Sequence, residues 1–150
     1  MLFPQISAPS DEGRPQAPLP ASADPSGAPR LGTCPILIVE DDADLREMMA
    51  QLLSLEGFEA HAVANGREAL DYLHNRAERP ELILLDLMMP VMDGWEFRRE
   101  QRNDPNLADV PVIVLSALDA SRGADIGAIE FLKKPLDFDH LLELVRQYCR

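Results

Sequence analysis

The sequence is poor in cysteine and has no long apolar run. Two cysteines in 150 residues, Cys34 and Cys149, are too few for the disulfide framework of a small secreted protein. We interpret them as two small buried thiols, although both are expected at the same edge of the predicted fold, where a contact between them stays open. No apolar run approaches the roughly 20 residues that span a membrane. The N-terminus also lacks the basic segment and apolar region of a secretory signal.

Basic residues are scarce relative to acidic ones, 14 against 26, which gives a formal net charge of −12. Broad nucleic-acid binding and binding to anionic membranes both require a positively charged surface, which this composition disfavours. We therefore expect a cytoplasmic protein that has no nucleic-acid partner and does not insert into a membrane.

The chain is predicted to contain a tail and one domain. Residues 1–33 hold seven of the 13 prolines, and their apolar residues follow neither a helical nor a strand period. Such a composition buries too little surface to offset the entropy of ordering, so we predict a disordered tail. The remaining residues, 34–150, suffice for a domain whose core needs no metal or disulfide.

From Pro35 onward, short apolar runs alternate with helical patterns. Continuous apolar runs indicate strands buried on both faces, as in parallel sheets covered by helices. The helix expected after Asp93 is the least clear, because it has few apolar anchors. Right-handed connections between the strands predict a flavodoxin-like, doubly wound (βα)5 parallel sheet with strand order 2-1-3-4-5. The five strands are predicted at 36–39, 58–64, 82–86, 110–115 and 129–133.

Polar side chains of matched chemistry follow four of these strands. Glu40 and Asp41 follow the first, Asp86 ends the third, Ser116 follows the fourth and Lys134 follows the fifth. Carboxylates gathered this closely cannot all stay ionised without a cation, and Mg²⁺ is the simplest hard ion for oxygen ligands. Beside such an ion a phosphoryl group would fit, with Asp86 in line as the nucleophile.

These segments, taken together and in order, resemble the receiver domain of two-component response regulators. The resemblance covers Pro35 to Arg150. Each matching segment is weak alone, but their combination is specific. The matching segments are Ile36-Leu37-Ile38-Val39-Glu40-Asp41, Asp86-Leu87-Met88-Met89-Pro90-Val91-Met92-Asp93-Gly94, Ser116-Ala117 and Gly127-Ala128-Ile129-Glu130-Phe131-Leu132-Lys133-Lys134-Pro135.

The resemblance implies a phosphoacceptor and a metal site. Asp86 would accept a phosphoryl group from a histidine kinase or a histidine phosphotransfer protein. Asp41, Asp86 and the backbone carbonyl of Met88 would ligate Mg²⁺, and Glu40 would act through a water molecule. Asp42 is not part of this set and is predicted to cap the helix that follows it.

The resemblance also implies a switch. Ser116 would move onto the phosphoryl group and Phe131 would move inward with it, while Lys134, followed by a cis Pro135, would complete the site. Without the resemblance, Phe131 would be interpreted as a half-buried core residue and Ser116 as a helix cap.

Two further groups of residues have plain structural interpretations. Met88, Met89 and Met92 are packing residues by default. The arginines of the third helical segment are interpreted as a solvated helix face; they are Arg98, Arg99 and Arg102.

One departure from the family pattern concerns the fourth helical segment. The span from Ser116 to Lys134 is about one helical turn, roughly four residues, shorter than usual. The deficit falls in 119–126, where Gly123 weakens helix further. We predict a short or irregular fourth helix. In receivers this helix commonly forms part of the surface that binds partners, so the sequence does not show whether this chain uses the same surface.

The leading functional hypothesis is a single-domain response regulator, since only 15 residues follow Pro135. It would signal by phosphorylation-controlled binding to a downstream protein or by onward phosphotransfer, and would not be an enzyme beyond its own phosphorylation and dephosphorylation. The alternative is a receiver-like interaction module that is not phosphorylated. A Mg²⁺-dependent phosphatase resembling the haloacid dehalogenases is disfavoured, because Met88 stands where those enzymes carry a second Asp.

The residues that flank the site predict a long-lived phosphorylated form. Met88, two residues after the phosphoacceptor, and Leu118, two residues after Ser116, are apolar where receivers often carry polar groups. Apolar side chains there would hinder the water that hydrolyses an acyl phosphate.

Overall fold

The computed structural model describes residues 34–75, 79–121 and 126–149. Five strands and four α-helices occur in these ranges. The strands are β1 (Pro35–Val39), β2 (Glu59–Val63), β3 (Leu82–Asp86), β4 (Val112–Ser116) and β5 (Glu130–Lys133). The helices are α1 (Ala43–Leu55), α2 (Gly66–His74), α3 (Gly94–Arg102) and α4 (Phe138–Tyr148).

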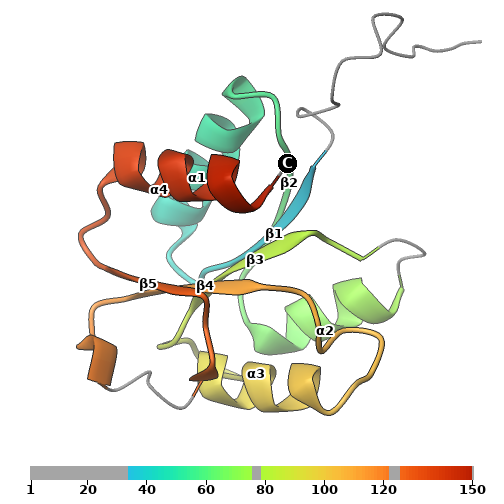
Figure 1. Ribbon diagram of the computed structural model, residues 1–150. Coiled ribbons are helices and arrows are strands. Elements are labelled where there is room, and N and C mark those ends of the chain that lie inside the picture. Colours follow the sequence, from blue (N-terminus) through green and yellow to red (C-terminus); the bar gives the residue numbers. More distant parts are fainter. Residues whose placement is uncertain (1–33, 76–78, 122–125, 150) are drawn as a thin grey trace, which may run out of the picture. The chain divides into compact units, whose positions relative to one another are not determined.

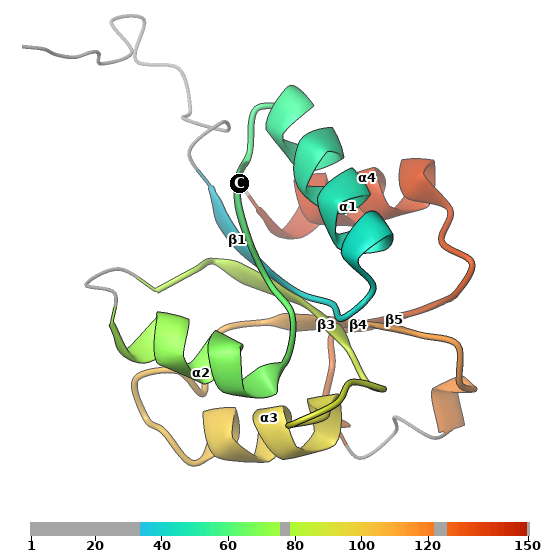
Figure 2. The same ribbon diagram turned by 180° about the vertical axis from the view of Figure 1, so that it is seen from behind.

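The strands form one parallel sheet in the order β2-β1-β3-β4-β5, which confirms the predicted flavodoxin-like arrangement. Helices α1 and α4 cover one face of the sheet, and α2 and α3 cover the other (Figures 1 and 2). The predicted tail over residues 1–33 lies outside the described residues.

Both faces of the sheet are buried, which explains the uninterrupted apolar runs of the central strands. Alternate residues of β1, β3 and β4 enter different cores. Leu37, Ile83 and Val114 pack toward α2 and α3, whereas Ile38 and Leu84 pack toward α1 and α4. Each strand is thereby held between two layers, so the residues at its carboxyl end are held in fixed places.

Side-chain caps set where the helices begin. The Asp42 carboxylate accepts hydrogen bonds from the backbone N–H groups of Asp44 and Leu45 at 3.0 and 3.2 Å, which confirms the predicted cap of α1. Asn65 and Asp93 cap α2 and α3 in the same way. These caps satisfy backbone donors that have no partner within the helix.

The segment between β4 and β5 contains no α-helix among its described residues, 117–121 and 126–129. Short 3₁₀ turns occur at residues 120–121 and 126. The centre of the predicted irregular helix, residues 122–125, lies outside the described part of the chain. The described ends of this segment agree with a short or irregular fourth helix.

The interpretation of the cysteines as two separate thiols is wrong, because the structure joins Cys34 to Cys149 in a disulfide. Their Cα atoms are 6.0 Å apart, within the range that a disulfide spans. The two residues are 115 positions apart in sequence. They meet because Cys34 directly precedes β1 and Cys149 directly follows α4, and α4 packs on the face of the sheet that contains β1.

None of the described helices has the length and apolar character needed to cross a membrane.

Candidate functional site

The carboxyl ends of β1 and β3 bring three carboxylates together. Val39 lies opposite Leu85 in the sheet, so Glu40 and Asp86 occupy the next positions on neighbouring strands. Glu40 is fully buried and Asp86 is 3% exposed, whereas Asp41 lies at the surface. One oxygen from each of the three lies within 4.8 Å of the others. The predicted acidic cluster is therefore assembled by the register of two adjacent strands.

Lys134 supplies the positive charge of the site. Its Nζ lies 2.7 Å from Glu40 Oε1 and 3.5 Å from Asp86 Oδ2. The peptide bond between Lys134 and Pro135 is cis, as expected. The backbone N–H of Lys134 also donates to the Ser116 carbonyl at 2.8 Å, which ties this residue to the end of β4.

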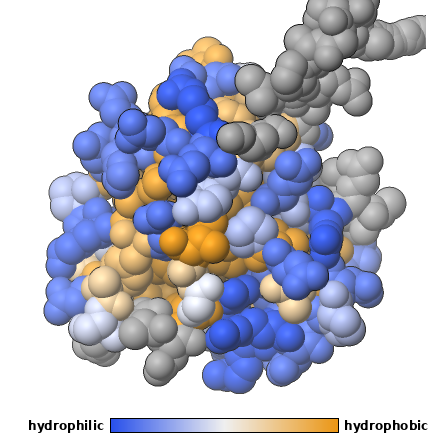
Figure 3. All heavy atoms as spheres, viewed as in Figure 1, coloured by the Kyte–Doolittle hydropathy of each residue, from blue (hydrophilic) through white to orange (hydrophobic). Residues whose placement is uncertain are grey.

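The predicted switch residues lie on β4, which neighbours β3, and on β5, the edge strand beside β4. Ser116 is fully buried at the end of β4, and its Oγ accepts a hydrogen bond from the Leu118 N–H at 3.1 Å. Phe131 in β5 is half-buried and lies opposite Val114. Figure 3 shows hydrophobic side chains gathered around the β5 edge of the sheet. Phe131 packs against the core on the α2 and α3 side of the sheet and is partly exposed.

Burial dominates the electrostatics of Asp86. Its removal from water, followed by the negative charge of Glu40, raises the pKa of the Asp86 carboxyl from 3.8 to about 7, although the charge of Lys134 opposes this change. Burial lowers the pKa of Lys134, but its hydrogen bond to Glu40 and the charge of Asp86 outweigh that effect and raise it. The single ammonium of Lys134 thus does not neutralise the three carboxylates, whereas a divalent cation beside them would do so.

The donor set fits Mg²⁺. Three carboxylates offer only hard oxygen ligands, and Asp41 lies at the surface, where bound water can complete a coordination shell. The backbone N–H of Met88 lies 3.4 Å from Asp86 Oδ1, which holds the loop after β3 against the Asp86 side chain. The ligand role predicted for the Met88 carbonyl stays a prediction. Met88 itself is 57% exposed, so the interpretation of Met88 as a packing residue is wrong.

Gly94 belongs to the matching segment that starts at Asp86, but no role at the site was predicted for it from the sequence. The structure shows what it does. A Cβ at this position would lie 2.5 Å from the Asp86 carbonyl oxygen and 2.8 Å from the Leu87 Cα. The Gly94 N–H donates to the Leu87 carbonyl at 2.9 Å. The start of α3 can therefore pack directly on the end of β3 only because this residue has no side chain.

The interpretation of Arg98 as part of a solvated helix face is wrong, because it is only 8% exposed. Its Nε donates to the Ile126 carbonyl at 2.8 Å and its Nη2 to the Gly127 carbonyl at 3.2 Å. Helix α3 has few apolar side chains to bury, and Arg98 attaches it instead to the segment before β5 through these hydrogen bonds. The shortage of apolar side chains was the feature of the sequence that could have indicated a buried polar contact.

Gln101 extends this buried contact. It is fully buried and accepts a hydrogen bond from Arg98 Nη1 at 2.8 Å. Its Nε2 donates to the carbonyls of Leu107 and Val110 at 2.9 and 3.1 Å. The two side chains thus connect α3 both to the loop before β4 and to the segment before β5.

The chain matches known proteins over the part that forms this sheet. The family model of the response regulator receiver domain matches residues 36–146. The response regulator MprA of Mycolicibacterium vanbaalenii is 38% identical over 119 residues, which cover 77% of this chain and 50% of that protein. The alkaline phosphatase synthesis transcriptional regulatory protein SphR of Synechococcus elongatus is 37% identical over 126 residues, which cover 77% of this chain and 48% of that protein. The chain spans about half the length of these curated relatives.

Solved structures of the same kind superpose closely. The signal receiver domain of a signal transduction histidine kinase from Syntrophus aciditrophicus gives a TM-score of 0.72 at 35% identity, covering 78% of this chain and 90% of that one. The response regulator TrrA of Thermotoga maritima, solved in complex with Mg²⁺ and BeF, gives a TM-score of 0.67 at 31% identity, covering 77% of this chain and 99% of that one.

Proposed function

The chain belongs to the response regulator receiver domain family, and from this premise we propose that Asp86 accepts a phosphoryl group from a histidine kinase or a histidine phosphotransfer protein. The observation that carries the proposal is the position of Asp86. It is buried at the end of β3, within 4.8 Å of Glu40 and Asp41, with the Lys134 ammonium 3.5 Å away.

The chemistry is a transfer between two nucleophiles. A carboxylate oxygen of Asp86 forms a bond to phosphorus while the bond from phosphorus to the donor histidine nitrogen breaks, and the imidazole leaves with the electron pair. Lys134 Nζ is close enough to Asp86 to contact the incoming phosphoryl oxygens. Because burial raises the pKa of Asp86, the free carboxyl is partly protonated near neutral pH and must lose its proton before it attacks.

Mg²⁺ would be held by Glu40, Asp41, Asp86 and the carbonyl of Met88, with Glu40 acting through water, and it would neutralise the charge that develops on the phosphoryl oxygens. The donor set described above supports this assignment. TrrA, a solved relative, was crystallised with Mg²⁺ and BeF.

The phosphorylated state would be read through Ser116 and Phe131. In this structure Ser116 Oγ accepts a hydrogen bond from the Leu118 N–H, and a phosphoryl group on Asp86 would offer the Ser116 hydroxyl proton a charged acceptor. Its movement would free space beside Phe131. A downstream protein would then bind the changed β4–β5 side, or a second phosphotransfer protein would take the phosphoryl group.

The alternative, an interaction module that is never phosphorylated, has one observation in its favour. Arg98 holds Ile126 and Gly127 against α3, so the segment next to the switch is tethered. We also propose that the protein does not turn over external phosphate esters, because Met88 offers no acid or base beside the nucleophile.

Beryllofluoride, which mimics an acyl phosphate, tests the proposal. Backbone NMR spectra of the full chain with Mg²⁺, with and without beryllofluoride, should show shifts at Ser116 and Phe131 that Asp86→Asn abolishes. Spectra unchanged by beryllofluoride would favour the interaction module.

A further inference from the structure

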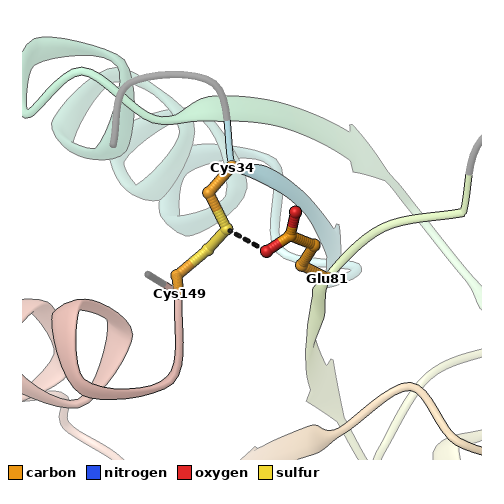
Figure 4. Close-up of side chains that lie close together, drawn as sticks. All are labelled: Cys34, Glu81 and Cys149. Atoms are coloured by element: carbon orange, nitrogen blue, oxygen red, sulfur yellow. Dashed lines mark hydrogen bonds between the residues drawn. A yellow bond between two sulfur atoms is a disulfide. The ribbon is translucent and has the colours of Figure 1, made fainter. Parts of the chain in front are cut away.

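A second cluster of metal-binding side chains lies at the other edge of the sheet. Cys34 precedes β1, Glu81 precedes β3, and Cys149 follows α4 (Figure 4). The phosphoacceptor lies at the carboxyl ends of these same strands, whereas this cluster lies at their amino ends. One ligand atom from each of the three residues lies within 4.8 Å of the others.

The backbone fixes these residues independently of their side chains. The N–H of Glu81 donates to the Pro35 carbonyl at 2.8 Å, and the Cys34 carbonyl accepts from the Glu59 N–H at 3.1 Å. The N–H of Cys149 donates to the Val145 carbonyl at 2.8 Å. Each of the three residues is therefore positioned by a backbone hydrogen bond directly beside a strand or helix.

The Glu81 carboxylate has an unusual neighbour. Its Oε1 lies 3.7 Å from Cys34 Sγ, and no lysine, arginine or histidine within the described ranges forms an ion pair with it. In the disulfide form Cys34 has no proton to donate. The contact becomes a hydrogen bond when the cysteines are reduced, because the Cys34 thiol then has a proton that the carboxylate can accept.

We propose that the reduced protein binds one Zn²⁺ through Cys34 Sγ, Cys149 Sγ and a Glu81 carboxylate oxygen, with water in the fourth position. A tetrahedral site with Zn–S near 2.3 Å and Zn–O near 2.1 Å requires about 3.6 Å between sulfur and oxygen ligands. The 3.7 Å between Cys34 Sγ and Glu81 Oε1 matches that edge. In the reduced protein the two sulfurs would have to separate to about 3.8 Å by rotation of their side chains.

The ligand chemistry separates this site from the acidic cluster. Thiolates are soft ligands that select Zn²⁺ over Mg²⁺, whereas the three carboxylates near Asp86 suit the hard ion. The cysteines are 3% and 1% exposed and Glu81 is at the surface, so the sulfurs are shielded while the carboxylate side admits an ion and a water molecule. Zinc would link β1, β3 and α4, and the disulfide excludes it because it consumes both thiolates.

Cobalt reports on this site directly, because a thiolate-to-Co²⁺ charge-transfer band appears only when sulfur binds the metal. The full chain is reduced, its two thiols are counted, and Co²⁺ is titrated in excess Mg²⁺, which occupies the acidic cluster. We expect one equivalent of Co²⁺ to produce the band and one equivalent of Zn²⁺ to displace it. Cys34→Ser and Cys149→Ser should each lose the band.

Two comparisons keep the test independent of folding. The wild-type disulfide form, made by exchange with oxidised glutathione, which is reduced to two thiols as the protein disulfide forms, should give no band. Glu81→Gln should weaken Zn²⁺ binding about 10-fold or more. Glu59→Gln, an exposed carboxylate on the other side of β1, should leave it unchanged. A reduced protein with two titratable thiols and no band, or equal affinities for Glu81→Gln and wild type, would overturn the proposal.

Discussion

Lys134 and Glu40 form an ion pair across the carboxyl edge of the sheet, with 2.7 Å between Nζ and Oε1. Two strands, β3 and β4, lie between β5 and β1. The Lys134 side chain therefore spans the end of β3, where Asp86 lies, before it reaches Glu40. Asp86, Lys134 and Glu40 are therefore parts of one charge network, in which the two carboxylates are buried.

Lys134→Ala should destabilise the metal-free protein by about 3 kcal/mol, because removal of one partner leaves the other charge buried and unpaired. Chemical denaturation measures the loss, and saturating Mg²⁺ should restore part of it. Lys133→Ala is the matched control. The Lys133–Asp119 pair, at 3.3 Å, is 60% and 76% exposed, so it should contribute less than about 1 kcal/mol. Equal losses in the two variants would contradict the network.

The raised pKa of Asp86 gives the metal-free protein a defined pH dependence. Between pH 3.8 and about 7 the folded protein holds a proton on Asp86 that the unfolded chain has released. The unfolded state binds fewer protons in this range, so the free energy of unfolding should fall as pH rises, by up to about 4 kcal/mol, and level off above the folded pKa. Denaturation of wild type and Asp86→Asn at several pH values isolates this contribution.

Mg²⁺ should reverse the sign of that dependence, because the ion binds the ionised carboxylate and competes with the proton. Calorimetric titration should give Mg²⁺ affinity that rises with pH up to about 7. Affinity that is flat over this range would contradict the raised pKa.

Arg98→Ala should reduce stability by about 2–3 kcal/mol, since it removes the donors to the Ile126 carbonyl and to Gln101, and a buried polar group without a partner costs about 1–3 kcal/mol. Arg99→Ala, on the exposed side of the same helix, should change stability by less than about 0.5 kcal/mol. Thermal and denaturant unfolding compare the two. Similar small effects would show that Arg98 is not a structural anchor.

The apolar neighbours of the site should slow hydrolysis of the phosphorylated form. Met88→Asn and Leu118→Glu should each shorten the lifetime of the phosphorylated protein several-fold, because a polar side chain there can hold the attacking water. Val91→Asn is the control, since Val91 lies on the same loop, is 78% exposed and has a φ of 68° that Asn tolerates. Decay rates that do not change in either variant would refute the hypothesis.

The sheet and the acidic site were predictable because they depend on local patterns. Continuous apolar runs identify strands buried on both faces, and parallel strands necessarily place their carboxyl ends at one edge. Glu40, Asp86 and Lys134 could thus be brought together without any knowledge of their distances.

The burial of Arg98 and the bond between the two cysteines could not be predicted in this way, although the topology had placed both cysteines at the same edge of the sheet. Arg98 and Arg99 are neighbours of the same type on one helix, yet one is buried and the other exposed. The contact of Cys34 with Cys149 requires α4 to end beside the start of β1, and helix length alone does not determine that.

The most direct test of the account is the intact mass of the protein after incubation with acetyl phosphate and Mg²⁺, for wild type and Asp86→Asn. We predict one hydroxylamine-labile phosphoryl group on the wild type, absent from the variant and absent without Mg²⁺. A wild-type protein that gains no phosphoryl group, under conditions where another receiver domain is labelled, would contradict the assignment of Asp86 as a phosphoacceptor.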